Sequence, residues 1–249
     1  MTRRGVLWLA WLVLLTQPVL AERPLKIVYY HDFRPFSWDE NGQAKGLFVD
    51  ILNEVLVRRL GLNVVHECYP WQRAQEMVEK GLADAFCTVP TPQRLAYASM
   101  GHTKVMTLDF TLFVKATNPR LAELGQVKSL AGLKGFKLGT YIGSGWAKKN
   151  LEGLDVQYMA RLENVLAMLD GDRFDGFIDV ALAIRYYIHQ MGLEGRIVEL
   201  PQVFDSSEFC FMIGKRSPYE HILPKVGAAL EDMSRDGTWQ NIMDKYYKS

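Results

Sequence analysis

Residues 81–94 read GLADAFCTVPTPQR and hold the pattern that decides the fold. Gly81 is a natural end for the helix expected over residues 71–80, because glycine readily adopts the left-handed conformation that closes a helix. Residues 83–88 are then expected to form a short strand, which the following turn with two prolines ends. A helix, a buried strand and a polar turn in this order indicate an α/β protein.

The segments on either side extend this pattern. Strands are expected at residues 25–30 and 62–67, with an amphipathic helix over residues 47–60 between them. Alternation of strands and helices predicts a mostly parallel sheet. A second unit of the same kind occupies roughly residues 129–200, and a strand at 208–213 with two following helices completes the chain.

The simplest arrangement of these parts is two α/β lobes joined by a two-segment hinge. We expect residues 22–115 and 205–249 to form lobe 1 and residues 116–204 to form lobe 2. The chain would then cross between the lobes near residues 114–118 and 204–207.

Composition excludes several classes of protein. The chain has 249 residues, of which 49% are hydrophobic and 23% charged, which is ordinary for a folded protein and unlike a disordered or multi-span membrane chain. Its formal net charge is +1. Without a basic excess, nucleic acid is not an expected partner.

Residues 1–21 have the features of a signal peptide. Arg3 and Arg4 precede the apolar run 6–15, and Val-Leu-Ala at 19–21 suits cleavage after Ala21. A membrane anchor is the weaker alternative, because about 20 apolar residues are needed to span a bilayer. Export to the periplasm is therefore predicted.

An ordered series of short motifs resembles the bacterial periplasmic solute-binding proteins of the amino-acid type (family 3). The strongest is GLADA at 81–85 followed by TPQR at 91–94. The others are RPFS at 34–37, GLFVDI at 46–51, KSLAGLKG at 128–135, GDRFDGFID at 171–179 and DGT at 236–238. The resemblance covers residues 22–249. It implies the type II periplasmic binding fold, a ligand cleft between the lobes, a monomer, and the membrane permease of an ABC transporter as partner.

The resemblance also implies the main ligand-binding residues. Arg94 matches the arginine that binds the carboxylate of the ligand, and Asp179 matches the aspartate that binds its ammonium group. The chemistry fits, because a planar guanidinium matches a carboxylate at two points. Both residues follow predicted strands, where open α/β sheets bind ligands. The simpler alternatives are a surface arginine and a helix-capping aspartate.

Further residues are expected at the cleft. Gly143 and Ser144, at a helix start, offer backbone N–H groups and a hydroxyl to a carboxylate. By the resemblance, Phe33 occupies the position whose ring stacks on the ligand. Trp71 and Trp146 either reach the cleft or pack within the lobes.

The chain departs from the family pattern near Arg94, at Val89 and again at residues 100–103. Val89 stands five residues before Arg94, where the family usually has the Ser or Thr that contacts the carboxylate, and Thr88 lies one residue earlier. We expect both residues at the cleft. These departures leave open a related carboxylate ligand that lacks the amine.

The predicted function is capture of a small polar solute, an amino acid or related carboxylate, for an ABC transporter. No catalytic residue, metal site or cofactor is predicted, because the five histidines are scattered and neither an HExxH nor a GxSxG motif occurs. An enzyme on the same fold, resembling the cyclohexadienyl dehydratases, is the alternative, and a sensor module is a third.

The chain has three cysteines, Cys68, Cys87 and Cys210. An odd number leaves at least one unpaired. In the fold that the resemblance implies, the returning strand lies beside the strand that ends near Thr88. This neighbourhood predicts that Cys87 and Cys210 face each other, where a disulfide would be compatible with export.

Overall fold

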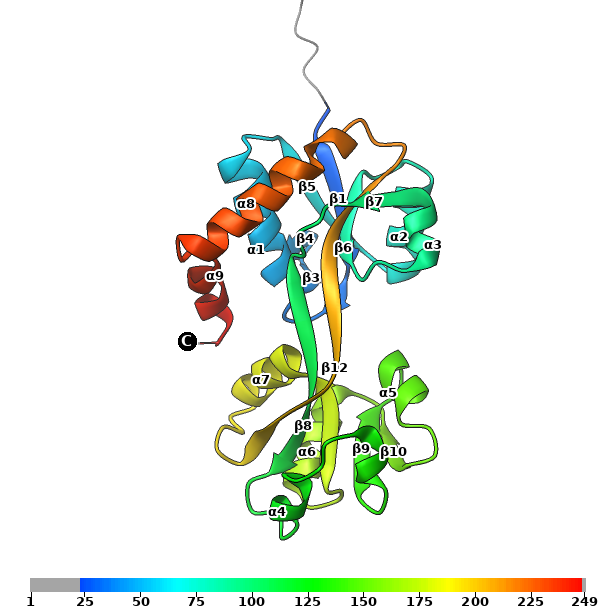
Figure 1. The fold of residues 1–249 in the computed structure, drawn as a ribbon, viewed down its shortest axis with the longest axis vertical. Coiled ribbons are helices and arrows are strands. Elements are labelled where there is room, and N and C mark those ends of the chain that lie inside the picture. The colour runs from blue at the N-terminus through cyan, green and yellow to red at the C-terminus, as the bar shows by residue number, and fades with distance from the viewer. Residues whose placement is uncertain (1–22, 248–249) are drawn as a thin grey trace, which may run out of the picture.

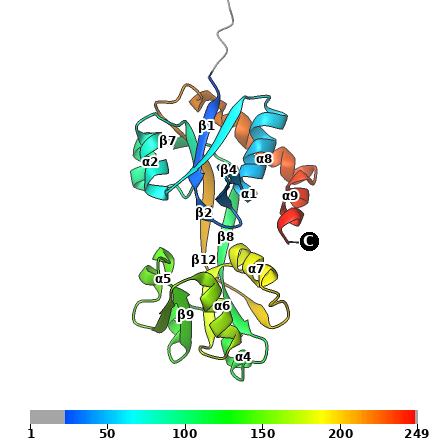
Figure 2. The ribbon, with the colours of Figure 1, turned by 180° about the vertical axis from the view of Figure 1, so that it is seen from behind.

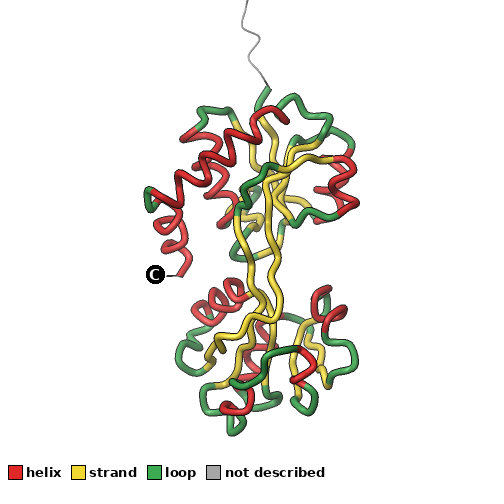
Figure 3. The backbone as a smooth tube through the Cα atoms, in the orientation of Figure 1, coloured by secondary structure: helices red, strands yellow, loops and turns green. Residues whose placement is uncertain are grey.

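The computed structural model describes residues 23–247, and the predicted signal peptide lies outside them. Two lobes are joined by two long strands (Figure 1). These strands are β8 (Met106–Lys115) and β12 (Ile197–Gly214), which pair antiparallel along their length. Both connections are strand rather than loop (Figure 3). The α/β class and the two-lobed architecture predicted from the sequence are confirmed.

Lobe 1 is built on a sheet in which β1 lies between β5 and β6, parallel to both, and β12 runs antiparallel beside β6. The bounds are β1 (Leu25–Tyr30), β5 (Val64–Tyr69), β6 (Ala85–Thr88) and β7 (Ala98–Met100), with helices α1 (Leu47–Asn53), its continuation η1 (Glu54–Arg59), α2 (Trp71–Glu79) and α3 (Pro92–Tyr97). A small antiparallel sheet, β2 (Asp32–Phe33), β3 (Ser37–Glu40) and β4 (Gln43–Lys45), follows β1. Helices cover both faces, so β1 is apolar on both: Ile27 packs in the cluster with α1, and Val28 in the cluster with α2.

Lobe 2, the lower lobe in Figure 2, contains the strand order β10–β9–β11–β8. The bounds are β9 (Lys137–Tyr141), β10 (Asp155–Met159) and β11 (Gly176–Val180), with helices α4 (Leu121–Leu124), α5 (Gly145–Asn150), α6 (Leu162–Asp170) and α7 (Ala181–Gln190). Strand β9 is parallel to both neighbours, whereas β11 and β8 are antiparallel. The carboxyl ends of β9 and β11 lie on the side of lobe 2 that faces lobe 1, because Tyr141 and Asp179 at these ends line a cavity together with residues of lobe 1.

The C-terminal helices return to lobe 1. Helix α8 (Leu223–Arg235) packs on η1 and helix α9 (Thr238–Tyr247) packs on α1. Arg59, the last residue of η1, joins this helix to the turn between α8 and α9. Its guanidinium donates to Asp236 over 2.7 Å and to the Thr238 hydroxyl over 2.9 Å. Helix α9 also contacts α7, so the C-terminal helix of lobe 1 reaches lobe 2 (Figure 1).

The first crossing lies earlier in the chain than residues 114–118, where we expected it. Strand β8 pairs with β12 from Met106 onward and is already paired with β11 at Phe110. The first crossing between the lobes therefore lies within the uninterrupted strand β8. This strand contains no glycine or proline, so its sequence gives no sign of where the chain leaves lobe 1. Strand β12 returns alongside, with Asp205 opposite Phe110.

Asp84, in the motif that decides the fold, has a structural role. Its fully buried carboxylate accepts two hydrogen bonds from Arg23 (2.6 and 2.7 Å), one from the Lys26 N–H (2.9 Å) and one from the Ser217 hydroxyl (2.6 Å). Burial alone would raise the pKa of Asp84, but these hydrogen bonds outweigh it and hold the pKa below its ordinary value. The carboxylate thus ties the start of β1 to β6 and to the returning chain.

The predicted pairing of Cys87 with Cys210 is wrong, and all three cysteines are free thiols. The two strands are neighbours as expected, but Cys210 lies opposite Thr88 and Cys87 opposite Phe211. Successive side chains of a strand point to opposite faces, so this offset places the two thiols on opposite sides of the sheet.

We expect thiol titration with Ellman's reagent in denaturant, without reductant, to find three thiols per chain. Because no disulfide restrains the unfolded chain, dithiothreitol should leave the thermal midpoint unchanged. A lower midpoint in dithiothreitol, or one titratable thiol instead of three, would contradict the register seen here.

Candidate functional site

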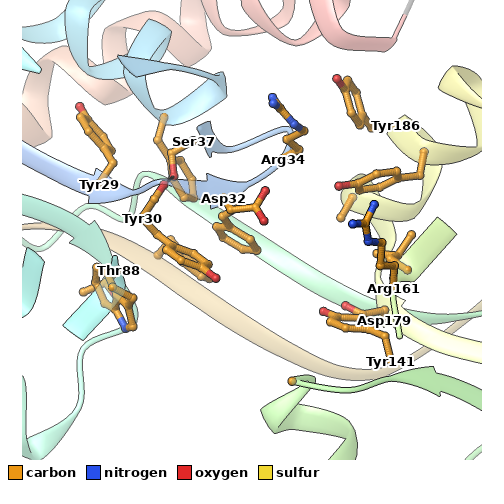
Figure 4. A pocket seen from close by; sticks show the side chains of 18 of the residues that line it. Tyr29, Tyr30, Asp32, Arg34, Ser37, Thr88, Tyr141, Arg161, Asp179 and Tyr186 are labelled. Carbon is orange, nitrogen blue, oxygen red and sulfur yellow. Dashed lines mark hydrogen bonds between the residues drawn. The ribbon is translucent and has the colours of Figure 1, made fainter. Parts of the chain in front are cut away.

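A cavity of about 1070 Å³ lies between the lobes and has walls from both. Lobe 1 contributes the end of β1, the β2–β3 turn, the end of β6 and the start of α3. Lobe 2 contributes the end of β9, the start of α6, the end of β11 and one face of α7. Figure 4 shows side chains from the two walls directed toward one space.

Most of the predicted site residues meet at this cavity. Those that line it are Arg94, Asp179, Phe33, Thr88, Val89, Gly143 and Trp71. Ser144 and Trp146 are not among its lining residues.

Ser144 and Trp146 make contacts within the protein instead. The buried Ser144 hydroxyl caps α5, accepting the Ala147 N–H over 3.3 Å. The Trp146 ring stacks on Phe110 with centroids 4.5 Å apart, and its Nε1–H donates to Asp205 over 2.6 Å. Trp146 therefore lies against the two crossing strands.

Arg94 is held in a fixed orientation on the lobe 1 wall. Thr91 caps α3 by accepting the Arg94 backbone N–H over 3.3 Å, which places the arginine in the first turn. The guanidinium donates from Nε to Gln75 Oε1 over 3.0 Å and from a terminal nitrogen to the Val89 carbonyl over 2.8 Å. Its central carbon lies 5.2 Å from the centre of the Trp71 ring.

The positive charge of Arg94 has no anionic partner within residues 23–247. Both of its side-chain acceptors are neutral, and no carboxylate lies within ion-pair distance of it there. Burial without a compensating anion lowers the pKa of Arg94, although a guanidinium remains charged in proteins. A half-buried, oriented and uncompensated cation facing a cavity is suited to bind an anion.

Val89 takes part in this arrangement through its backbone. Its carbonyl orients Arg94, whereas its side chain offers no hydrogen bond to a ligand. The preceding Thr88 is buried and lines the same wall. Thr88 thus offers a hydroxyl one residue before position 89, where the resemblance places the usual Ser or Thr.

Asp179 forms the matching negative group on lobe 2. It lies near the end of β11 with only 6% of its surface exposed. One carboxylate oxygen accepts the Val180 N–H over 2.7 Å, and the other makes no hydrogen bond to any described residue. Burial raises the pKa of Asp179 to about 6, with the Val180 N–H and the neighbouring Tyr141 hydroxyl partly opposing the rise. Tyr141 and Asp179 lie together in Figure 4.

Aromatic rings form an apolar part of the cavity. Phe33 contacts Phe36 and Phe209, with ring centroids 4.7 and 6.0 Å apart. Phe48 joins the same cluster through Phe209 at 5.3 Å. Since Phe33, Phe48 and Phe209 all line the cavity, a bound molecule would meet an apolar surface beside the two charged groups.

Sequence reasoning missed several lining side chains. Asp32 and Arg34 reach the cavity from lobe 1, and Arg161 and Glu163 from lobe 2. All four lie close after a strand or at the start of a helix, where open α/β sheets bind ligands, so this rule could have found them. Figure 4 shows Asp32 and Arg161 directed into the space between the walls.

Two tyrosines on α7 were also missed by the sequence analysis. Tyr186 and Tyr187 line the cavity. Burial, aided by the charges of Glu163 and Asp32, raises the pKa of Tyr187 to about 12. These charges come from both lobes, so Tyr187 lies where the two walls approach each other.

Two further findings concern residues 23–247 as a whole. No three His, Cys, Asp or Glu side chains in this range are grouped to hold a metal ion. None of its helices is both long and apolar enough to cross a membrane.

Comparison with known proteins places the chain in a family. Residues 25–249 match the family model "Bacterial extracellular solute-binding proteins, family 3". The probable amino-acid-binding protein YxeM of Bacillus subtilis (strain 168) is 23% identical over 220 residues, which cover 86% of this chain and 80% of YxeM.

Solved structures that share the fold include a substrate-binding domain and a solute-binding protein. The open form of the second substrate-binding domain of Lactococcus lactis GlnP has a TM-score of 0.70 and 21% identity, covering 90% of this chain and 95% of the domain. An ancestral cationic amino acid solute-binding protein, AncCDT-1, has a TM-score of 0.71 and 24% identity, covering 90% of this chain and 95% of its own. As the ordered motifs predicted, the chain belongs to the bacterial extracellular solute-binding proteins of family 3.

Proposed function

We propose that this protein captures a free α-amino acid outside the cytoplasm and presents it to the permease of an ABC transporter. One observation carries the proposal: Arg94 and Asp179 lie on opposite walls of one cavity, and each lacks a counter-charge among the described residues. An α-amino acid carries the two complementary charges on adjacent groups. Its carboxylate would pair with Arg94 and its ammonium group with Asp179.

Closure of the lobes accompanies binding in this proposal. Arg94 belongs to lobe 1 and Asp179 to lobe 2, so a ligand that engages both favours the closed arrangement. The strands β8 and β12 are the only described connections between the lobes, and bending within them supplies the motion. Micromolar affinity needs about 8 kcal/mol of net binding free energy, which two charge-assisted contacts and the aromatic surface can supply.

The family assignment supports the transport role over the enzymatic alternative, because the family and the related YxeM are described as binding proteins. Delivery to a permease, action as a monomer and location in the periplasm after cleavage at Ala21 are parts of the same proposal. Mass spectrometry of the exported protein tests the last part: its N-terminus should be Glu22.

The experiment is a thermal-shift panel of the twenty L-amino acids, each compared with the amine-free acid of the same skeleton. At a ligand concentration of 100 Kd, binding stabilises the native state by about 2.7 kcal/mol. We therefore expect at least one amino acid to raise the midpoint by several degrees and its amine-free analogue to raise it less. An amine-free acid that stabilises more would rule out pairing of an amine with Asp179, and a panel without any binder would contradict the proposed function.

A further inference from the structure

We propose that Gln75 is a positioning residue for Arg94: it fixes the guanidinium through a neutral acceptor and restricts an incoming carboxylate to the edge formed by the two terminal nitrogens. The inference rests on the proposed role of Arg94 as the partner of the ligand carboxylate. It assigns a function to a side chain that the sequence motifs do not mark.

The first step is the geometry of α2. Trp71 and Gln75 are four residues apart on this helix and therefore share one face. The Trp71 ring lies under the Arg94 guanidinium at 5.2 Å, and Gln75 Oε1 accepts its Nε–H over 3.0 Å. One helix face thus supplies both a flat surface for the guanidinium and an acceptor at its edge. The Val89 carbonyl, in the loop after β6, holds a terminal nitrogen from another direction.

The second step concerns the donors that remain. A guanidinium has five N–H groups in one plane and can bind a carboxylate at two points along either of two edges. One edge includes Nε, and Gln75 occupies that N–H. The other edge consists of the two terminal nitrogens, of which one donates a single bond to Val89 and the other has no partner among the described residues. The edge that includes Nε is therefore closed to a two-point contact, and the terminal edge keeps the nitrogen that has no partner among the described residues, so we infer that a carboxylate binds there.

The third step concerns charge. Glutamate could accept from Nε with similar geometry, but it would form an ion pair with Arg94. That pair would neutralise the cation and compete with the ligand carboxylate. An amide orients the guanidinium and leaves its charge available, which fits the absence of any carboxylate within ion-pair distance of Arg94 in residues 23–247.

The test compares Gln75→Glu and Gln75→Met with a matched control, Gln72→Glu. Gln72 lies on the same helix but is exposed, bonds only to Glu76 among the described residues, and does not line the cavity. The probes for calorimetry are whichever of the twenty L-amino acids binds most tightly and the α-carboxamide of that amino acid.

We expect Gln75→Glu to weaken binding of the amino acid at least about tenfold, since the new carboxylate neutralises a half-buried cation. The carboxamide lacks the negative charge, so its weaker binding should change less and the acid-to-amide preference should shrink. Gln75→Met should lose about threefold to tenfold through disorder of the guanidinium. Gln72→Glu should stay within twofold of the wild type, and melting curves confirm that each variant is folded.

A second measurement needs no ligand. In ¹⁵N-arginine-labelled protein, the Arg94 Nε–H should exchange slowly with solvent, and Gln75→Met should abolish that protection.

Two results would overturn the positioning role. One is unchanged protection of the Arg94 Nε–H in Gln75→Met, and the other is wild-type affinity in Gln75→Glu. If Gln75→Glu binds normally while Arg94→Ala does not, this inference fails and the proposed function stands. If Arg94→Ala itself binds normally, the carboxylate role of Arg94 fails, and the exchange measurement still decides whether Gln75 holds the guanidinium.

Discussion

Arg94→Ala is expected to weaken amino-acid binding by about 2–5 kcal/mol, the usual cost of removing one partner of a buried charge pair. The expected loss is thus at least about thirtyfold in Kd. The reason is that the closed cavity would hold the ligand carboxylate without a counter-charge. The Val89 carbonyl and the Gln75 amide oxygen would then face it, and both are acceptors that repel an anion.

Arg94→Lys should recover little of this loss. An ammonium group cannot donate to Gln75, to Val89 and along a planar edge at the same time. Arg73→Ala is the matched control, because Arg73 is exposed on the neighbouring helix α2 and does not line the cavity. Calorimetry with the best-binding amino acid decides the matter. If Arg94→Ala binds within threefold of the wild type, Arg94 does not bind the carboxylate.

The predicted site residues that line the cavity share one property: each lies near the end of a strand, in the turn that follows one, or at the start of a helix. The resemblance supplied Arg94 and Asp179, and their positions at or after the ends of strands agree with the rule that the carboxyl ends of strands in an open α/β sheet meet at one edge. This rule depends only on the order of elements, which the hydrophobic periodicity of the sequence reveals. It predicts which loops meet, but it does not predict which side chain of a loop points inward.

Ser144 and Trp146 illustrate that limit. They lie within three residues of Gly143, yet only Gly143 lines the cavity. Their directions depend on how α5 docks against β8 and β12, where Phe110 and Asp205 receive the indole. Such contacts join segments about 40–60 residues apart, and local pattern carries no information on them.

The cysteines show the same limit within a sheet. The neighbouring positions of β6 and β12 followed from the resemblance, and the strands do pair. A shift of one residue in register reverses the face on which a side chain lies. Whether Cys87 met Cys210 or Phe211 therefore could not be decided from the order of the strands.

The pH dependence of binding should be governed by Asp179. In the free protein its pKa is raised to about 6 because burial disfavours the charged form. A ligand ammonium group pairs only with the charged form, so binding must displace a proton below that pH. Affinity for an amine-bearing ligand should therefore be roughly tenfold weaker at pH 5 than at pH 7, with little change above pH 7.

The stability of the free protein should respond to pH in the opposite sense. Asp179 favours the folded state most below its ordinary pKa of 3.8, because its pKa is higher in the folded than in the unfolded protein. This contribution to stability is lost as the pH rises through about 6.

Asp179→Asn separates this effect from other titrations. The variant keeps the shape of the side chain but cannot carry the charge, so an amine-bearing ligand should bind at least about thirtyfold more weakly at pH 7. Its affinity should also lose the step near pH 6, while an amine-free acid should bind nearly as well as to the wild type. Asp155→Asn, an exposed change at the start of β10, is the control for removal of one charge from lobe 2. If calorimetry between pH 5 and 8 shows the same step in Asp179→Asn, another group titrates with binding. If amine-bearing and amine-free ligands lose affinity equally, Asp179 supports the wall of the cavity and does not bind the ammonium group.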